Sequence, residues 1–302
     1  MCIRDRDWWP GIHDPSDKAD SVNINVTINK GQMVVSNGLL SNIDSTSNEN
    51  LVTYQWKERY PIATYLVSLA IYPYDFWEQS FQSSNGKILP IHHYVFPDQK
   101  EYFENNYNKT PEVLKVLSDF FGEYPFIEEK YGHVSFLWPG GMEHQTISSM
   151  CCPDMYLIVH EAAHQWWGDM VTCKDFNNIW LNEGFATYSQ ALWYEKKEGI
   201  ETRNKFIRNL ACDLKGNTLV LFNYVEKHGL PLYEMINSHT DKPVHLVYGG
   251  VDVDDREEIR RLVENEDNSI IVASYGTFSL SLIHISEPTR RTPISYAVFC
   301  LK

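Results

Sequence analysis

The sequence predicts an α+β fold, with a β-sheet region at residues 7–97 followed by a mainly helical region at residues 98–278. The first region contains short segments in which apolar and polar residues alternate with a period of two, the pattern of half-buried strands. From residue 98 onwards the apolar residues recur at helical spacing instead. We therefore expect sheets first, and then the packed helices that carry the functional residues.

The strands expected in the first region are short and separated by turn sequences. Residues 22–28 alternate between apolar and polar types, and the segment Asn29-Lys30-Gly31 then predicts a turn. Four further strands are predicted at 33–35, 53–57, 65–71 and 91–96.

The second region opens with a predicted helix at residues 107–122. Thr110 is its cap candidate, and Pro111 suits the first turn because its missing N–H has no partner there. The other elements expected outside the central motif are a strand at 134–138, a helix at 202–211 and helical stretches within 220–236, broken by Gly229 and Pro231.

Two histidines four residues apart dominate the helical region. His160 and His164 lie in a predicted helix at 155–167 that ends near Gly168, and residues four apart share one face of a helix. At that separation two imidazoles can bind the same Zn²⁺. Glu161 follows the first histidine, where a carboxylate can accept a proton from an activated water molecule.

A third candidate ligand distinguishes a metal site from an ordinary pair of core histidines. A lone histidine in an apolar helix is usually a core residue with a satisfied hydrogen bond. Glu183 follows His164 by nineteen positions and opens a second helical pattern at 181–197. Two histidines, one glutamate and an open position form the ligand set of a catalytic zinc site, not of a structural one.

These motifs resemble a known family. The pattern H-E-x-x-H, eighteen residues and then Glu183 within N-E-G-F-A is similar to the zinc aminopeptidases related to aminopeptidase N and the leukotriene hydrolase. The resemblance runs from about Trp8 to Trp193. It implies that residues 98–278 form a thermolysin-like catalytic domain with one Zn²⁺, after a partial N-terminal β domain.

A second motif resembles the exopeptidase signature G-x-M-E-N of that family. It reads Gly140-Gly141-Met142-Glu143-His144, and Glu143 precedes His160 by seventeen residues. The resemblance implies that this segment is an edge strand beside the metal and that Glu143 binds the free α-amino group of the substrate. The two glycines allow a substrate backbone to approach closely. His144 stands where the family usually has Asn. This difference leaves the role of Glu143 intact, but the family's substrate preference does not carry over to this chain.

Two further residues have candidate roles. The family uses a tyrosine, usually in a Y-x-K-G setting, to stabilise the oxyanion, and Tyr248 or Tyr275 is the candidate here, although neither is followed by that lysine. Asp169 is a candidate to orient a metal ligand, with a capping or surface role as the alternative.

Composition narrows the class of protein. The net charge of −14 should repel phosphate backbones, which argues against nucleic-acid binding. The sequence contains no run of about eighteen apolar residues, so no membrane span is predicted. The six cysteines form no paired framework; free thiols are expected, with a disulfide between Cys173 and Cys212 left open.

The two ends of the sequence differ from the rest. Residues 1–6 and 279–302 continue no neighbouring pattern and resemble translated sequencing-adapter sequence, so we expect them not to belong to the natural protein. The natural protein would then extend further at both ends, which leaves its compartment, cytoplasmic, periplasmic or secreted, open.

The combined expectation is a zinc metallo-aminopeptidase that acts on peptides with a free N-terminus, with Glu161 as general base. Two alternatives stay open at this point. One is a zinc endopeptidase without N-terminal recognition, and the other is an inactive chain that binds zinc or a peptide and turns nothing over.

Overall fold

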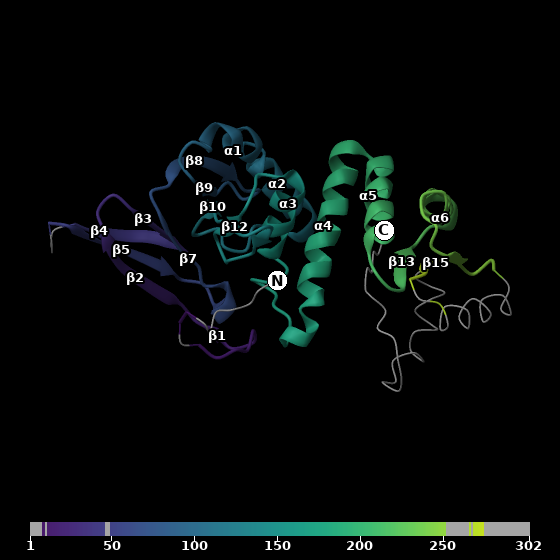
Figure 1. Cartoon of the computed structure of the whole chain (residues 1–302), viewed down its shortest axis with the longest axis horizontal. Coiled ribbons are helices and arrows are strands. Elements are labelled where there is room, and N and C mark those ends of the chain that lie inside the picture. The colour runs from purple at the N-terminus through teal and green to yellow at the C-terminus, as the bar shows by residue number, and fades with distance from the viewer. Residues whose placement is uncertain (1–7, 10, 46–48, 252–265, 267, 275–302) are drawn as a thin grey trace. The chain divides into compact units, whose positions relative to one another are not determined.

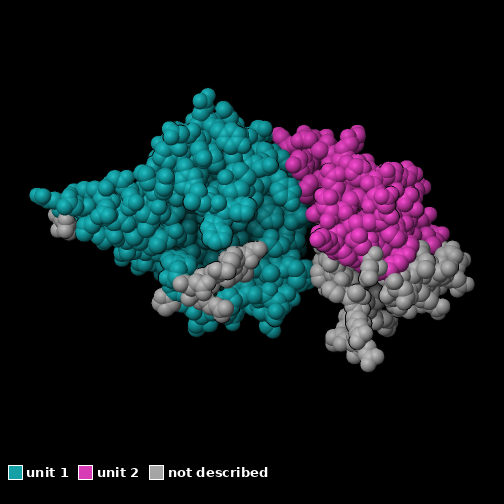
Figure 2. All heavy atoms as spheres, viewed as in Figure 1, with its two compact units in different colours: residues 1–193 teal, residues 194–302 magenta. Residues whose placement is uncertain are grey.

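The computed structural model describes residues 8–9, 11–45, 49–251, 266 and 268–274. The chain divides into two compact units, residues 1–193 and residues 194–302 (Figure 2). The adapter-like segments 1–6 and 279–302 lie outside the described residues. The predicted α+β class is confirmed, because sheets occupy the first part of the chain and the long helices follow them (Figure 1).

The N-terminal part of the first unit consists of antiparallel strands. Three of them form a sheet in the order β2-β5-β4: β2 (Val22–Asn29), β5 (Leu51–Glu58) and β4 (Leu39–Asp44). Two smaller pairs join β3 (Met33–Ser36) to β7 (Leu69–Tyr72) and β1 (Lys18–Ala19) to β6 (Ile62–Ala63). Side chains of β2 alternate between more buried and exposed positions, as its period-two sequence predicts.

A five-stranded sheet supports the candidate site. Its order is β11-β12-β10-β9-β8, with bounds Gly141–Met142, Ser148–Met150, Tyr131–Ser135, Ile88–Val95 and Asp75–Gln82. Strand β10 pairs in parallel with both β9 and β12, whereas β11 pairs antiparallel with β12. The sheet takes strands from both sides of residue 97, where the sequence suggested a domain boundary. The two regions also share a core, in which Val34 and Trp56 pack in one cluster with Val134 and Ile147.

Three α-helices of the described chain lie within the first unit, α1 (Lys100–Tyr107), α2 (Thr110–Phe121) and α3 (Met155–His164). Helix α4 (Trp180–Glu198) runs across the boundary at residue 193, and α5 (Ile200–Asp213) belongs to the second unit. The sequence placed one helix at 107–122, whereas the structure has α1 and α2. Thr110 is the first residue of α2 and not its cap, because Lys109 occupies the cap position. None of the helices in the described part of the chain is long and apolar enough to cross a membrane.

Two predicted elements differ from the structure. Residues 65–71 were expected to form one strand, but Thr64–Leu66 is a 3₁₀ turn and only β7 follows it as a strand. The sequence predicts helical stretches within residues 220–236, broken by Gly229 and Pro231. Their start belongs to strand β13 (Thr218–Phe222), whose side chains are all buried. A short apolar run of this kind does not distinguish a buried strand from a helix.

The second unit contains a parallel three-stranded sheet. Its order is β13-β15-β14, where β15 is Ile270–Ser274 and β14 is Val244–Val247. After β13 come a π-helical turn at Val225–Gly229 and helix α6 (Leu230–Asn237). Pro231 lies in the first turn of α6 and does not break it, since a proline needs no hydrogen-bond acceptor at that position.

Candidate metal centre

Helix α3 carries the two histidines of the motif on one face. Asp154 caps the helix by accepting a hydrogen bond from the backbone N–H of Tyr156 at 2.9 Å. Four apolar side chains of the helix are buried, namely Ile158, Val159, Ala162 and Ala163. This packing fixes the rotation of the helix and thereby the direction of His160 and His164.

Helix α4 supplies Glu183, and the preceding residue anchors the start of this helix. The buried Asn182 donates a hydrogen bond from Nδ2 to the hydroxyl of Tyr65 at 3.3 Å. Its Oδ1 accepts a hydrogen bond from the backbone N–H of Cys173 at 3.2 Å. The first turn of α4 is therefore attached to the β region and to the segment that links the two helices.

The ligand atoms of the three predicted metal ligands converge. His160 Nε2 lies 3.1 Å from His164 Nε2 and 3.2 Å from Glu183 Oε2, and His164 Nε2 lies 3.6 Å from the same carboxylate oxygen. Atoms bound at about 2.0–2.1 Å to a tetrahedral zinc ion lie about 3.3 Å from one another. The three measured separations therefore fit the face of a zinc tetrahedron.

The hydrogen bonds around His164 leave its Nε2 available for a metal. Nδ1 lies 3.0 Å from the backbone oxygen of Trp167, and a carbonyl oxygen only accepts, so Nδ1 carries the proton. In the neutral ring the Nε2 lone pair then faces His160 and Glu183. Among the described residues, His160 Nδ1 and Glu183 Oε1 are buried atoms without a hydrogen-bond partner.

Buried carboxylates surround this cluster. Burial raises the pKa of Glu143, and it raises the pKa values of Glu161 and Asp169 well above their usual range. Although burial lowers the pKa of His164, the neighbouring acids, first Glu143, raise it to about 10. Despite its own burial, Glu183 has a pKa below the usual range because His160 and His164 hydrogen-bond to it. A divalent cation bound among these acidic side chains would favour their ionised forms and balance their negative charge.

The exopeptidase-like segment lies directly against the candidate general base. Glu143, Glu161 and His164 each place one ligand atom within a group whose members all lie within 4.8 Å of one another. A Cβ atom built on Gly141 would lie 2.6 Å from Cδ of Glu161, so no larger residue fits there without displacing that side chain. Strand β11 also ends the described five-stranded sheet, which leaves an edge for an extended peptide.

The residues after Glu143 are held in an unusual backbone conformation. Thr146 has a φ of 65°, in the left-handed region that residues with a Cβ rarely adopt. Its N–H donates to Gln165 Oε1 at 2.8 Å, and its Oγ1 accepts from the N–H of Gly38 at 2.8 Å. Gln165, directly after His164, also donates through Nε2 to the backbone oxygen of His144 at 3.4 Å. The metal helix and the segment of Glu143 are therefore joined through one glutamine.

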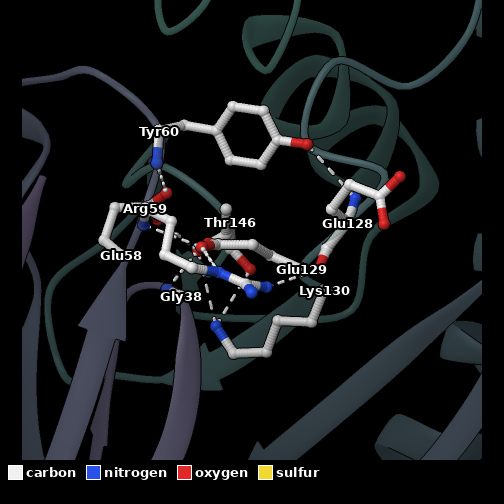
Figure 3. A network of polar contacts seen from close by, with 8 residues as sticks. All are labelled: Gly38, Glu58, Arg59, Tyr60, Glu128, Glu129, Lys130 and Thr146. Carbon is white, nitrogen blue, oxygen red and sulfur yellow. Dashed lines mark hydrogen bonds and ion pairs between the residues drawn. The ribbon is translucent and has the colours of Figure 1, made fainter. Parts of the chain in front are cut away.

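A buried lysine completes the support of Thr146 (Figure 3). Lys130 Nζ donates to the backbone oxygen of Thr146 at 3.3 Å. It also donates to the backbone oxygen of Ser36 at 3.1 Å. Thr146 Oγ1 in turn donates to Glu58 Oε2 at 3.2 Å. Burial and the neighbouring Glu129 raise the pKa of Glu58 to about 8, whereas burial lowers the pKa of Lys130 to about 8.

The predicted site residues divide into those that the structure brings together and those that it does not. His160, His164, Glu183, Glu161 and Glu143 form the two overlapping groups described above. The remaining residues of the motif, Gly140, Gly141 and Met142, run beside them in and next to β11.

The two tyrosine candidates lie beyond the first unit in the sequence. Tyr248 follows β14 in the second unit, and its role as the oxyanion donor stays a prediction. Tyr275 lies outside the described residues. Asp169 is fully buried, so a surface role is wrong; its side-chain oxygens have no hydrogen-bond partner among the described residues, and Trp167 holds His164 Nδ1 instead.

Sequence reasoning missed three supporting residues, Asn182, Gln165 and Thr146. Two of them left a signal, since Asn182 and Gln165 are amides adjacent to candidate ligands in otherwise apolar helical segments, where a buried amide must find partners. Thr146 left none, because its backbone conformation depends on contacts with distant strands.

Comparisons with known proteins agree with this geometry. Residues 143–230 match the peptidase family M1 domain. Glutamyl aminopeptidase of Bos taurus is 24% identical over 277 residues, which cover 85% of this chain and 27% of that protein. Probable aminopeptidase 1 of Sulfurisphaera tokodaii is 30% identical over 181 residues, 55% of this chain and 22% of that protein. The chain thus spans about a quarter of the length of these relatives.

A solved structure shares the same fold. The M1 zinc metallopeptidase of Deinococcus radiodurans, in a mutant form bound to a Tyr-Ser-Ala substrate, superimposes with a TM-score of 0.54 and 26% identity. The match covers 66% of this chain and 44% of that one.

Proposed function

We propose that this chain, which matches the peptidase family M1 domain over residues 143–230, is a zinc metallo-aminopeptidase that removes the N-terminal residue of peptides. His160, His164 and Glu183 would hold one zinc ion. When bound, zinc supplies Lewis-acid chemistry, which makes a water molecule more acidic and polarises the scissile carbonyl. The observation that carries the proposal is the convergence of three ligand atoms at 3.1–3.6 Å beside two further buried carboxylates.

Glu161 acts as the general base in this proposal. Its carboxylate is buried, and its Oε2 has no hydrogen-bond partner among the described residues, so this oxygen is free to accept the proton of the attacking water. Burial raises the pKa of this carboxyl, whereas the positive charge of a bound zinc ion would favour its ionised form, the form that accepts a proton. Because Gly141 has no side chain, the carboxylate of Glu161 can lie directly beside it.

Glu143 fixes the position of the substrate. Its carboxylate is buried, and its Oε1 lacks a partner among the described residues, so an ammonium group would supply both the charge and the hydrogen bonds that it needs. An extended peptide that lies along the edge of β11 would bring its N-terminus to this carboxylate. The anchored ammonium then places the first peptide bond at the metal, which limits cleavage to one residue per turnover.

Two matched substrates test this function. An aminoacyl chromogenic amide with a free amine should be hydrolysed, the N-acetylated form should not, and a metal chelator should abolish the reaction until zinc is restored. Comparable rates on the two substrates would favour a zinc endopeptidase. Zinc binding without turnover of either substrate would mean that the chain is a metal-binding protein and not a peptidase.

A further inference from the structure

Two neighbouring thiols lie beside the anchoring segment and have no part in the proposed reaction. Cys151 and Cys152 follow strand β12, and both are free and partly exposed. Their sulfur atoms lie 2.9 Å apart. At this separation a single ligand atom can reach both sulfur atoms.

The thiol pair is connected directly to the site. The backbone N–H of Gly140 donates to Cys151 Sγ at 3.2 Å, and the N–H of Cys151 donates to the oxygen of Gly140 at 3.1 Å. The next residue pair, Gly141 and Met150, is in register in the β11–β12 ladder. A movement of Cys151 would therefore displace strand β11, which contacts Glu161 through Gly141.

A bridging atom suits this pair better than a direct disulfide bond. The Cα atoms of adjacent residues are about 3.8 Å apart, whereas disulfides usually join Cα atoms that are at least about 4.4 Å apart. A disulfide between neighbours is consequently strained. An inserted atom enlarges the ring and relieves this strain, and thiol ligands prefer soft, thiophilic elements.

We propose that Cys151 and Cys152 form a vicinal dithiol site for trivalent arsenicals, and that its occupation disables the anchoring segment. In the reaction with an arsenic(III) oxide of the type R–As=O, two S–H bonds and the As=O bond break, two S–As bonds form, and one water molecule leaves. No change of oxidation state is involved. The bridge would draw Cys151 Sγ out of its present position at 3.2 Å from the N–H of Gly140, and the group R would lie beside the edge of β11.

Phenylarsine oxide tests the site, with peptide-mapping mass spectrometry as a readout that does not depend on activity. The native chain should take up one phenylarsenic group, mapped to the peptide that contains both cysteines. Two attachment points should make capture about 100-fold tighter than capture by one thiol. Cys151→Ser and Cys152→Ser should each lose this affinity, and a dithiol should release the adduct whereas a monothiol at equal thiol concentration should not.

Cys212→Ser is the matched control, because Cys212 is also a free, partly exposed thiol but lies in the second unit. It should bind the arsenical as the native chain does. Equal capture by Cys151→Ser, or an adduct mapped to other cysteines, would overturn the proposal.

The second half of the proposal rests on the proposed aminopeptidase function. Capture should reduce kcat/KM for a free-amine substrate about tenfold or more, since misplaced anchoring groups cost rate. A mapped adduct with undiminished hydrolysis would refute the link to the anchoring segment. If the chain hydrolyses no substrate, mass spectrometry still decides whether the dithiol site exists, so failure of the two proposals can be told apart.

Discussion

Replacement of Gly141 with alanine should disable the site without touching a metal ligand. The new Cβ would lie 2.6 Å from Cδ and 2.8 Å from Cγ of Glu161. Carbon atoms in contact are normally about 3.5–4.0 Å apart, so the carboxylate or strand β11 must move by about 1 Å. A displacement of about 1 Å at a reacting group costs about 100-fold in rate, which is about 2.7 kcal/mol of transition-state stabilisation.

The assay compares kcat and zinc content of the Gly141→Ala chain with those of the native chain. We expect unchanged zinc content and a kcat lower by about 100-fold, because the ligands His160, His164 and Glu183 are untouched while the base is displaced. Gly184→Ala is the control: its Cβ would have no neighbour within 4 Å, so activity should stay within about twofold. A Gly141→Ala chain as active as this control would refute the contact between β11 and Glu161.

Three further predictions concern the carboxylates. Glu161→Gln should retain zinc and lose about 10²–10⁴-fold in kcat, the range of general acid–base catalysis; full activity would rule out the general-base role. Glu143→Ala should reduce kcat/KM for free-amine substrates far more than any activity on N-blocked ones, and a uniform loss would contradict anchoring. Glu58→Gln tests the raised pKa of the buried Glu58. The pKa of Glu58 is higher in the folded chain than in the unfolded chain, so its contribution to stability is complete below about pH 4.5. As the pH rises from there towards about 8, the free energy of unfolding falls by at most about 1.4 kcal/mol per pH unit. Urea unfolding at several pH values should therefore show the native chain losing stability relative to Glu58→Gln between about pH 4.5 and about pH 8; parallel curves would contradict the shift.

The metal ligands were predictable because their arrangement is mostly local. The spacing of His160 and His164 follows from helical periodicity alone, and one connection, residues 165–179, separates their helix from that of Glu183. The contact between Gly141 and Glu161 was not predictable in the same way. The sequence motif relates Gly141 to the approach of a substrate backbone, whereas in the structure the carboxylate of Glu161 also requires the space beside Gly141.

The elements that the sequence missed depend on long-range contacts. The strand Thr218–Phe222 is buried along its whole length, and only its first residue, Thr218, is polar. Its sequence therefore shows no alternation of apolar and polar residues that would distinguish a strand from a helix. The left-handed conformation of Thr146 arises from bonds to Gly38, Lys130 and Gln165, which come from three other segments. Neither feature has a local signature in the sequence.

Zinc stoichiometry tests the central claim most directly. Elemental analysis of the purified chain, stripped of metal and titrated with Zn²⁺, should give one tightly bound zinc per chain, and the affinity should fall steeply in His164→Ala. His239→Ala is the control, since this histidine lies in the second unit and belongs to neither of the described metal-ligand groups. It should bind zinc as the native chain does. Equal zinc affinity in His164→Ala and the native chain would contradict the assignment of His160, His164 and Glu183 as a zinc site.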